Sequence, residues 1–267
     1  MNRGVRPALR SWIWAVFAAL ALLGCATPPG ERRDLTTASD ETDAQKRARI
    51  RLELASAYFS QGQSRTALDE IKLALQADPN LPQAYNLRGL IYANLGEDGL
   101  AEESFRRGMQ LDPRDPDTRH NYGWFLCSRR RYQESYAQFD GAIALPQYRE
   151  VTKTLLAKGV CQARAGDLPD AEATLMKSYE MDPGNPATAM NLAAVLFRRG
   201  EYERARFYVR RVNAVPQLVN PESLWLAARI EHKLGNRSGA LDFGEQLRRR
   251  FPDSREAVAF ERGRYDD

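Results

Sequence analysis

Histidine and cysteine are scarce in this sequence, which has two and three of them among 267 residues. His120 and His232 lie far apart, and neither has another ligand at the spacing of a metal site. We interpret both as surface histidines and expect no metal. The chain also lacks a P-loop, a dinucleotide-binding fingerprint and the HExxH and GxSxG motifs. These absences favour a protein that is not an enzyme and uses no cofactor or small-molecule substrate.

The chain has no large excess of charge of either sign. Its 39 lysines and arginines stand against 35 acidic residues, for a net charge of +4. Residues 1–24 contain Arg3, Arg6 and Arg10 and no acidic residue, so 36 basic residues remain without them. Because the remaining chain is nearly neutral, it offers no electrostatic reason to bind nucleic acid.

No apolar run is long enough to cross a membrane comfortably. The run Trp12–Leu23 has 12 residues, about 18 Å as a helix against a hydrocarbon core of about 30 Å. Basic residues precede it, which is typical of a secretory signal peptide over 1–24. The sequence from Leu22 to Cys25 resembles the bacterial lipobox, in which the cysteine carries lipid after cleavage. The alternative is an uncleaved anchor with an incidental cysteine.

The resemblance implies a lipid anchor on Cys25, with several acyl chains that hold it firmly in a membrane. Ala26 follows, where an Asp would resemble the inner-membrane retention signal, so we expect export to the outer membrane. Residues 25–44 are polar and have no apolar period, which predicts a lipidated flexible tether.

The rest of the chain is an internal repeat with a period of 34 to 36 residues. One series of small residues comprises Ala55, Gly89, Gly123, Gly159, Ala193 and Ala228. A second series, 12 residues further on in each unit, comprises Ala67, Ala101, Ser135, Ala171, Ala205 and Ala240. Two antiparallel helices approach to about 8–10 Å only where the crossing residues are small. The pattern therefore predicts an all-α chain of helix–turn–helix units.

Larger residues four positions after the second series are expected to fill the space beyond each crossing. They are Ile71, Phe105, Phe139, Leu175 and Val209. Asp115-Pro116, Asn185-Pro186 and Asn220-Pro221 predict helix starts, with a capping side chain followed by proline at the first helical position.

This pattern resembles the tetratricopeptide repeat, most specifically in the second unit. The residues that carry it there are Tyr85, Gly89, Tyr92, Ala101, Phe105 and Pro113. The resemblance implies a solenoid, a right-handed superhelix of helix pairs, over 45–254. The expected repeats are 48–81, 82–115, 116–149, 152–185, 186–219 and 221–254, followed by a capping segment over 255–267. Gln162 and Glu231 replace the usual apolar residues, and Gly244 leaves the space beyond the sixth helix crossing unfilled.

In such a solenoid the first helices line a concave groove, so the groove positions recur in each unit. The middle of the predicted stripe is apolar, which favours binding of a partner helix or hydrophobic strand over a charged peptide end. The alternative is that some of these residues belong to the core. The predicted partner-binding residues are Phe59, Asn86, Leu90, His120, Trp124, Leu156, Val160, Met190 and Phe197. Trp124 is the strongest candidate, because large aromatic residues dominate many interfaces.

Cys127 and Cys161 lie on the first helices of adjacent units. A disulfide is possible in an exported protein. We expect two packed thiols instead, because the helical register does not direct the two side chains at each other.

A lipoprotein built almost wholly of these repeats resembles the PilF/PilW-type pilotins of type IV pilus biogenesis. The stretches that carry this resemblance are 84–90, 121–127, Arg131-Tyr132 and 202–206. It implies an outer-membrane lipoprotein with its repeats in the periplasm. Such a protein binds subunits of the pilus secretin and promotes their localisation to the outer membrane and their multimerisation there.

Two other functions remain open at this point. One is another outer-membrane repeat lipoprotein, a scaffold for β-barrel assembly or cell-wall synthesis. The other is an enzyme with an unrecognised site, although no convergent acid–base residues are visible in the sequence. A repeat architecture favours binding, which is an argument from fold alone.

Overall fold

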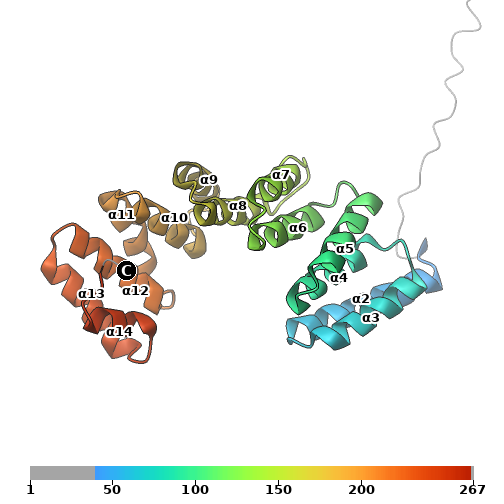
Figure 1. The fold of residues 1–267 in the computed structure, drawn as a ribbon, viewed down its shortest axis with the longest axis horizontal. Coiled ribbons are helices and arrows are strands. Elements are labelled where there is room, and N and C mark those ends of the chain that lie inside the picture. The colour runs from blue at the N-terminus through green and yellow to red at the C-terminus, as the bar shows by residue number, and fades with distance from the viewer. Residues whose placement is uncertain (1–39, 266–267) are drawn as a thin grey trace, which may run out of the picture. The chain divides into compact units, whose positions relative to one another are not determined.

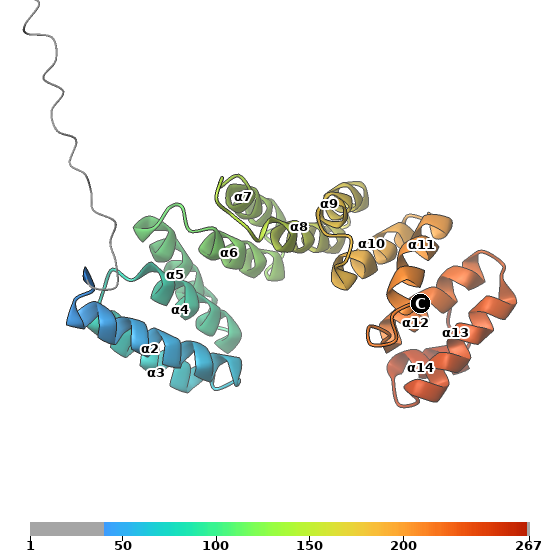
Figure 2. The same ribbon diagram turned by 180° about the vertical axis from the view of Figure 1, so that it is seen from behind.

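The computed structural model describes residues 40–265, and this part of the chain contains thirteen α-helices and no strand. Twelve of them pair into antiparallel hairpins that follow one another in chain order (Figures 1 and 2). The predicted all-α architecture is confirmed. The hairpins are α2 (Asp43–Ser60) with α3 (Ser64–Ala77), α4 (Pro82–Leu95) with α5 (Asp98–Leu111), α6 (Pro116–Ser128) with α7 (Tyr132–Ile143), α8 (Val151–Ala165) with α9 (Leu168–Met181), α10 (Pro186–Arg198) with α11 (Tyr202–Asn213), and α12 (Pro221–Lys233) with α13 (Arg237–Arg250).

Small residues permit the close approach within each hairpin, as the repeat pattern predicts. A Cβ atom on Gly89 would lie 2.7 Å from the ring of Phe105, and one on Gly123 would lie 2.8 Å from the ring of Phe139. Both rings are fully buried. The larger residue therefore packs directly on the glycine, and the space that a side chain would need is already filled.

The predicted helix starts are also confirmed. The Asp115 side chain accepts hydrogen bonds from the first-turn amides of α6, and Asn185 does the same for α10. Asn220 forms a capping box with Ser223 at the start of α12. These side chains satisfy amide groups that have no partner within the helix.

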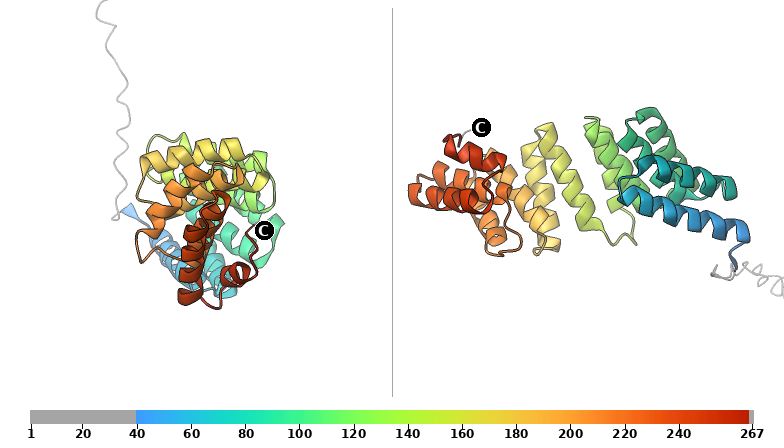
Figure 3. Two further views of the ribbon diagram at one scale, coloured as in Figure 1. Left: turned by 90° about the vertical axis from the view of Figure 1, so that its left-hand side faces the viewer. Right: turned by 90° about the horizontal axis from the view of Figure 1, so that it is seen from below.

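In the last hairpin the space beyond the helix crossing is filled, contrary to the expectation from Gly244. A short helix, α14 (Arg255–Glu261), packs against α12 and α13 (Figures 1 and 3). Its Phe260 ring lies where a side chain on Gly244 would otherwise be, since a Cβ atom there would come within 2.0–2.4 Å of three ring carbons. The expectation from the sequence was wrong because the filling side chain comes from outside the repeat.

Glu231 stands in the same hairpin at a position that is usually apolar. Its side chain is 1% exposed, and the Arg210 guanidinium lies 2.7 Å from its carboxylate. Asn236 donates a second hydrogen bond of 2.8 Å to it. A buried carboxylate is tolerated here because both of its oxygens have partners.

Candidate partner-binding trough

The first helices of the third, fourth and fifth hairpins line an open apolar hollow of about 430 Å³, which we call the central hollow. Its lining residues are His120, Asn121 and Trp124 of α6, Lys153, Leu156, Ala157 and Val160 of α8, and Asn191 of α10. The structure thus brings together four of the predicted groove residues, from two different repeats. The hollow is open to solvent and mainly apolar, so it is suited to receive a bulky apolar side chain.

A second, smaller hollow of about 250 Å³ continues from Asn191, which lines both; we call it the C-terminal hollow. Its other lining residues are Met190 and Ala194 of α10, Glu222, Trp225, Leu226 and Arg229 of α12, and Glu256 of α14. Because Asn191 belongs to both hollows, they form one trough that runs across α6, α8, α10 and α12.

Trp124 supplies the large aromatic side chain of the central hollow, and 38% of its surface is accessible. The Arg164 guanidinium of α8 lies 4.8 Å from its ring centroid, a distance at which a cation–π interaction is favourable. The arginine orients the indole ring while part of the ring stays open. An aromatic side chain held in this way is pre-organised for a partner.

His120 forms part of the floor of the central hollow, and the prediction of a surface histidine is wrong for it. Its side chain is only 8% exposed, and its Nδ1 atom lies 2.8 Å from the hydroxyl oxygen of Thr154. The hydroxyl of Tyr148 lies 2.6 Å from the same oxygen. Burial lowers the pKa of His120 to about 4, so the imidazole is neutral at physiological pH.

A disulfide joins Cys127 of α6 to Cys161 of α8, with Cα atoms 5.9 Å apart. The expectation of separate thiols was wrong, and Cys127 is buried, with 2% of its surface exposed. Cys127 lies four residues after Gly123, whereas Cys161 lies two residues after Gly159. Two residues correspond to about 200° around a helix, so the cysteines occupy opposite faces, as neighbouring helices require.

The remaining predicted groove residues lie outside the central hollow. Phe59 packs against the core cluster shared by the first and second hairpins, and Leu90 packs against the cluster shared by the second and third. Asn86 of α4 accepts a 3.1 Å hydrogen bond from Asn121, which connects it to the edge of the central hollow. Phe197 packs against Arg229, whose guanidinium lies 4.7 Å from the ring centroid.

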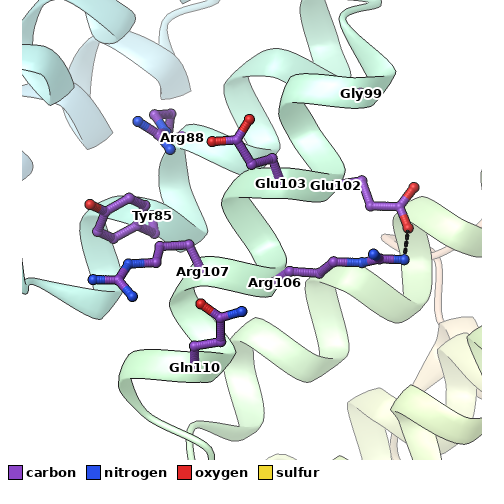
Figure 4. Close-up of a pocket in the computed structure, with 8 residues that line it drawn as sticks. All are labelled: Tyr85, Arg88, Gly99, Glu102, Glu103, Arg106, Arg107 and Gln110. Atoms are coloured by element: carbon purple, nitrogen blue, oxygen red, sulfur yellow. Dashed lines mark hydrogen bonds and ion pairs between the residues drawn. The ribbon is translucent and has the colours of Figure 1, made fainter.

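A third hollow, of about 700 Å³, lies instead on α4 and α5 and is polar (Figure 4). Glu102 forms ion pairs with Arg131 and with Arg106, and the hydrogen-bonded contact with Arg131 above all lowers the pKa of Glu102 to about 2. The Arg88 guanidinium lies 4.7 Å from the ring centroid of Tyr85. Glu102 and Arg106 are already paired with each other, and the lining contains no aliphatic side chain, so this hollow is the weaker candidate for an apolar partner site.

Neither a membrane-spanning helix nor a metal site is found in the described range. Between residues 40 and 265, no helix is both long and apolar enough to cross a membrane. Over the same residues, no three His, Cys, Asp or Glu side chains are grouped so that they could hold a metal ion.

Known proteins share this arrangement over most of its length. The crystal structure of PilW, a widely conserved type IV pilus biogenesis factor, matches with a TM-score of 0.74 and 33% sequence identity. The match covers 80% of this chain and 97% of PilW. The chain belongs to the PilF/PilW family of type IV pilus biogenesis proteins.

Other comparisons agree with membership of the PilF/PilW family. The type IV pilus assembly protein PilF of Pseudomonas aeruginosa is 27% identical over 243 residues, which are 91% of this chain and 94% of PilF. A solved structure of that PilF has a TM-score of 0.71 and 25% identity, and covers 83% of this chain and all of the other. Tetratricopeptide-repeat models match residues 45–116 and 162–218.

In this PilF/PilW-family chain, four residues that line the central hollow were not among the predicted groove residues: Asn121, Lys153, Ala157 and Asn191. A signal for them was present. Asn121, Ala157 and Asn191 each lie two residues before the small residue of their first helix, and Lys153 lies six before. The prediction followed only one stripe of each helix, whereas the hollow is lined by two adjacent stripes.

Proposed function

We propose that this protein is an outer-membrane lipoprotein that binds subunits of the type IV pilus secretin. By holding them at the membrane, it promotes their localisation and multimerisation there. Membership of the PilF/PilW family supports a role in pilus biogenesis, and the apolar trough supports protein binding. The proposed role requires no catalysis, cofactor, nucleic acid or small-molecule substrate.

The proposal assigns the membrane address to the N-terminus of the chain. Signal peptide 1–24 is removed, Cys25 is acylated, and residues 25–44 connect the lipid to the six repeats between 48 and 254 in the periplasm. Residues 1–24, Cys25 and the tether up to residue 39 lie outside the described residues, and the last two residues of the predicted tether, Asp43 and Ala44, begin α2. The support for this part is the lipobox-like sequence before Cys25 and the alanine after it. A tether of this kind raises the local concentration of the bound partner at the membrane.

The docking site in this proposal is the central hollow, and the exposed ring of Trp124 is the observation that carries it. Leu156 and Val160 line the hollow beside this ring. Burial of one large apolar side chain of a partner contributes about 1.5–3 kcal/mol. A partner side chain packed against Trp124 would therefore account for a substantial part of the affinity.

Capture of the secretin from the native envelope tests the docking site. Trp124→Ala is expected to weaken secretin capture and to reduce secretin multimers, with the helical content unchanged. Phe207→Ala is the matched control, because Phe207 is a 54% exposed aromatic residue on α11, outside both hollows. Undiminished capture by the Trp124 variant would remove the central hollow as the docking site.

The anchor is tested separately. Cys25→Ser is expected to release the protein from the membrane fraction and to leave the secretin mislocalised. Membrane association that persists in this variant would contradict the lipid anchor. If the wild-type protein captures no secretin at all, the proposed partner is wrong.

A further inference from the structure

The two hollows of the trough are built from the same positions of the repeat. Relative to the small residue of each first helix, the lining residues lie six, three and two positions before it and one after it. In α8 these four positions are Lys153, Leu156, Ala157 and Val160, and in α12 they are Glu222, Trp225, Leu226 and Arg229. The trough therefore repeats its geometry from one hairpin to the next, while its chemistry changes.

The most informative change is one of charge. Lys153 and Glu222 occupy the same position of the repeat two units apart and carry opposite charges. Glu256 of α14 adds a second carboxylate to the C-terminal hollow, which also contains one cation, Arg229, whose Nε donates a hydrogen bond to the backbone oxygen of Tyr265. The structure gives none of the side chains of Lys153, Glu222 and Glu256 an ion pair or a hydrogen bond with another described residue. Lys153 lies near Asp117, where burial raises the pKa of the carboxyl and the positive charge of Lys153 opposes that rise. Charged groups without such partners at the rim of a binding site are available to a ligand.

We infer that the trough binds one protein segment in a single direction. The segment places apolar side chains in the central hollow, an acidic side chain beside Lys153, and a basic side chain beside Glu222 and Glu256. This inference rests on the proposed function, in which the trough holds the partner. Opposite charges across an interface fix the register of the partner and disfavour the reversed orientation.

The spacing of the helices sets the distance between the acidic and basic groups of the bound partner segment. α8 contacts α10, and α10 contacts α12. Neighbouring helices are about 8–10 Å apart, so the two charged ends of the trough are separated by on the order of 20 Å. The acidic and basic groups of the bound segment must be separated by a similar distance.

Charge reversal in the full-length acylated protein tests this direction. Lys153→Glu and Glu222→Lys are each expected to weaken capture of the secretin about tenfold at low salt, and high salt should reduce the difference. Lys177→Glu and Glu180→Lys are the matched controls, because both residues are exposed on α9 and line neither hollow. Reversal variants that bind like the wild type would overturn the inference.

Cross-linking identifies the occupant and its direction. A photo-cross-linking amino acid in place of Lys153 is expected to attach to the acidic end of one secretin segment, and one in place of Glu222 to its basic end. Cross-links in the opposite order, to a second copy of this chain, or to its own tether would overturn the inference. If Trp124→Ala abolishes capture while the reversals do not, the direction is wrong but the proposed function stands. If the wild type captures no secretin, both fail.

Discussion

The ring of Phe260 in α14 packs on Gly244 of α13, in the space that a larger residue of the repeat fills in other hairpins. Three of its ring carbons lie within 2.4 Å of the position of a Cβ atom on Gly244. The last hairpin thus completes its core with a side chain from beyond the repeat. Solenoid ends need such a cover, because no further hairpin packs against them.

Removal of that ring should loosen the C-terminal end of the solenoid. Phe260→Ala is expected to lower the stability of the last hairpin by about 2–3 kcal/mol, since it leaves a cavity over Gly244. Hydrogen exchange of the α13 amides measures the effect. Val258→Ala on the same helix is the control, because Val258 is 39% exposed and should cost less than about 1 kcal/mol. Equal protection of α13 in both variants would contradict this role.

Two glycines of the second hairpin, Gly89 and Gly99, give a test of close helix packing and its control. Gly89→Ala would place a Cβ atom 2.7–2.8 Å from three carbons of the buried Phe105 ring. We expect a loss of about 1–3 kcal/mol in the free energy of unfolding. Gly99→Ala on the paired helix meets nothing within 4 Å and should be neutral or stabilise by up to about 1 kcal/mol. Urea denaturation distinguishes the two, and equal shifts would argue against close packing at Gly89.

These glycine contacts were predictable because they follow from one period and one steric rule. The pairing of Phe105 with Gly89 needs only the spacing of residues along two helices. The position of Phe260 was not predictable, because it depends on how the chain folds back after the last repeat. Contacts inside the repeated unit could be predicted from the sequence, whereas contacts with segments outside the repeat could not.

The candidate site shows the same division. Trp124, Leu156 and Val160 were placed in one groove from their repeat positions, and the structure brings them together around the central hollow. The burial of His120 was missed, because it depends on Thr154 and Tyr148 from the next unit and the loop before it. The disulfide was missed because residues that face each other across two helices occupy different positions of the repeat.

The disulfide between α6 and α8 should stabilise the part of the solenoid that carries the central hollow. Its cysteines are 34 residues apart, and closing a loop of that length contributes about 4 kcal/mol in the chain-entropy model. Reduction by dithiothreitol is expected to lower the urea midpoint of the wild-type protein. The Cys127→Ala/Cys161→Ala variant should be less stable and insensitive to the reductant. An equal effect of the reductant on both proteins would show that it acts elsewhere.

Stability should also depend on pH through His120. Its pKa is lowered to about 4 in the folded state, against about 6.5 in the unfolded chain, because burial disfavours the charged imidazolium. Between these values the unfolded state binds more protons than the folded state, so stability falls as the pH falls from 6.5 to 4. The expected loss is about 2 kcal/mol by pH 5, measured by urea denaturation at pH 7.5 and 5. Glu102, with a pKa of about 2 against a usual value of 4.5, loses its stabilising contribution as the pH falls below about 4.5, which lies outside the measured range of 7.5 to 5.

Two variants show whether His120 causes this loss. His120→Gln can still form a hydrogen bond with Thr154 but has no proton to gain in this range, so it should remove most of the pH dependence between 7.5 and 5. His232→Gln should retain it, because His232 is exposed on α12. If the His120→Gln variant still loses about 2 kcal/mol of stability by pH 5, the His120 imidazole is not the group whose protonation causes the loss.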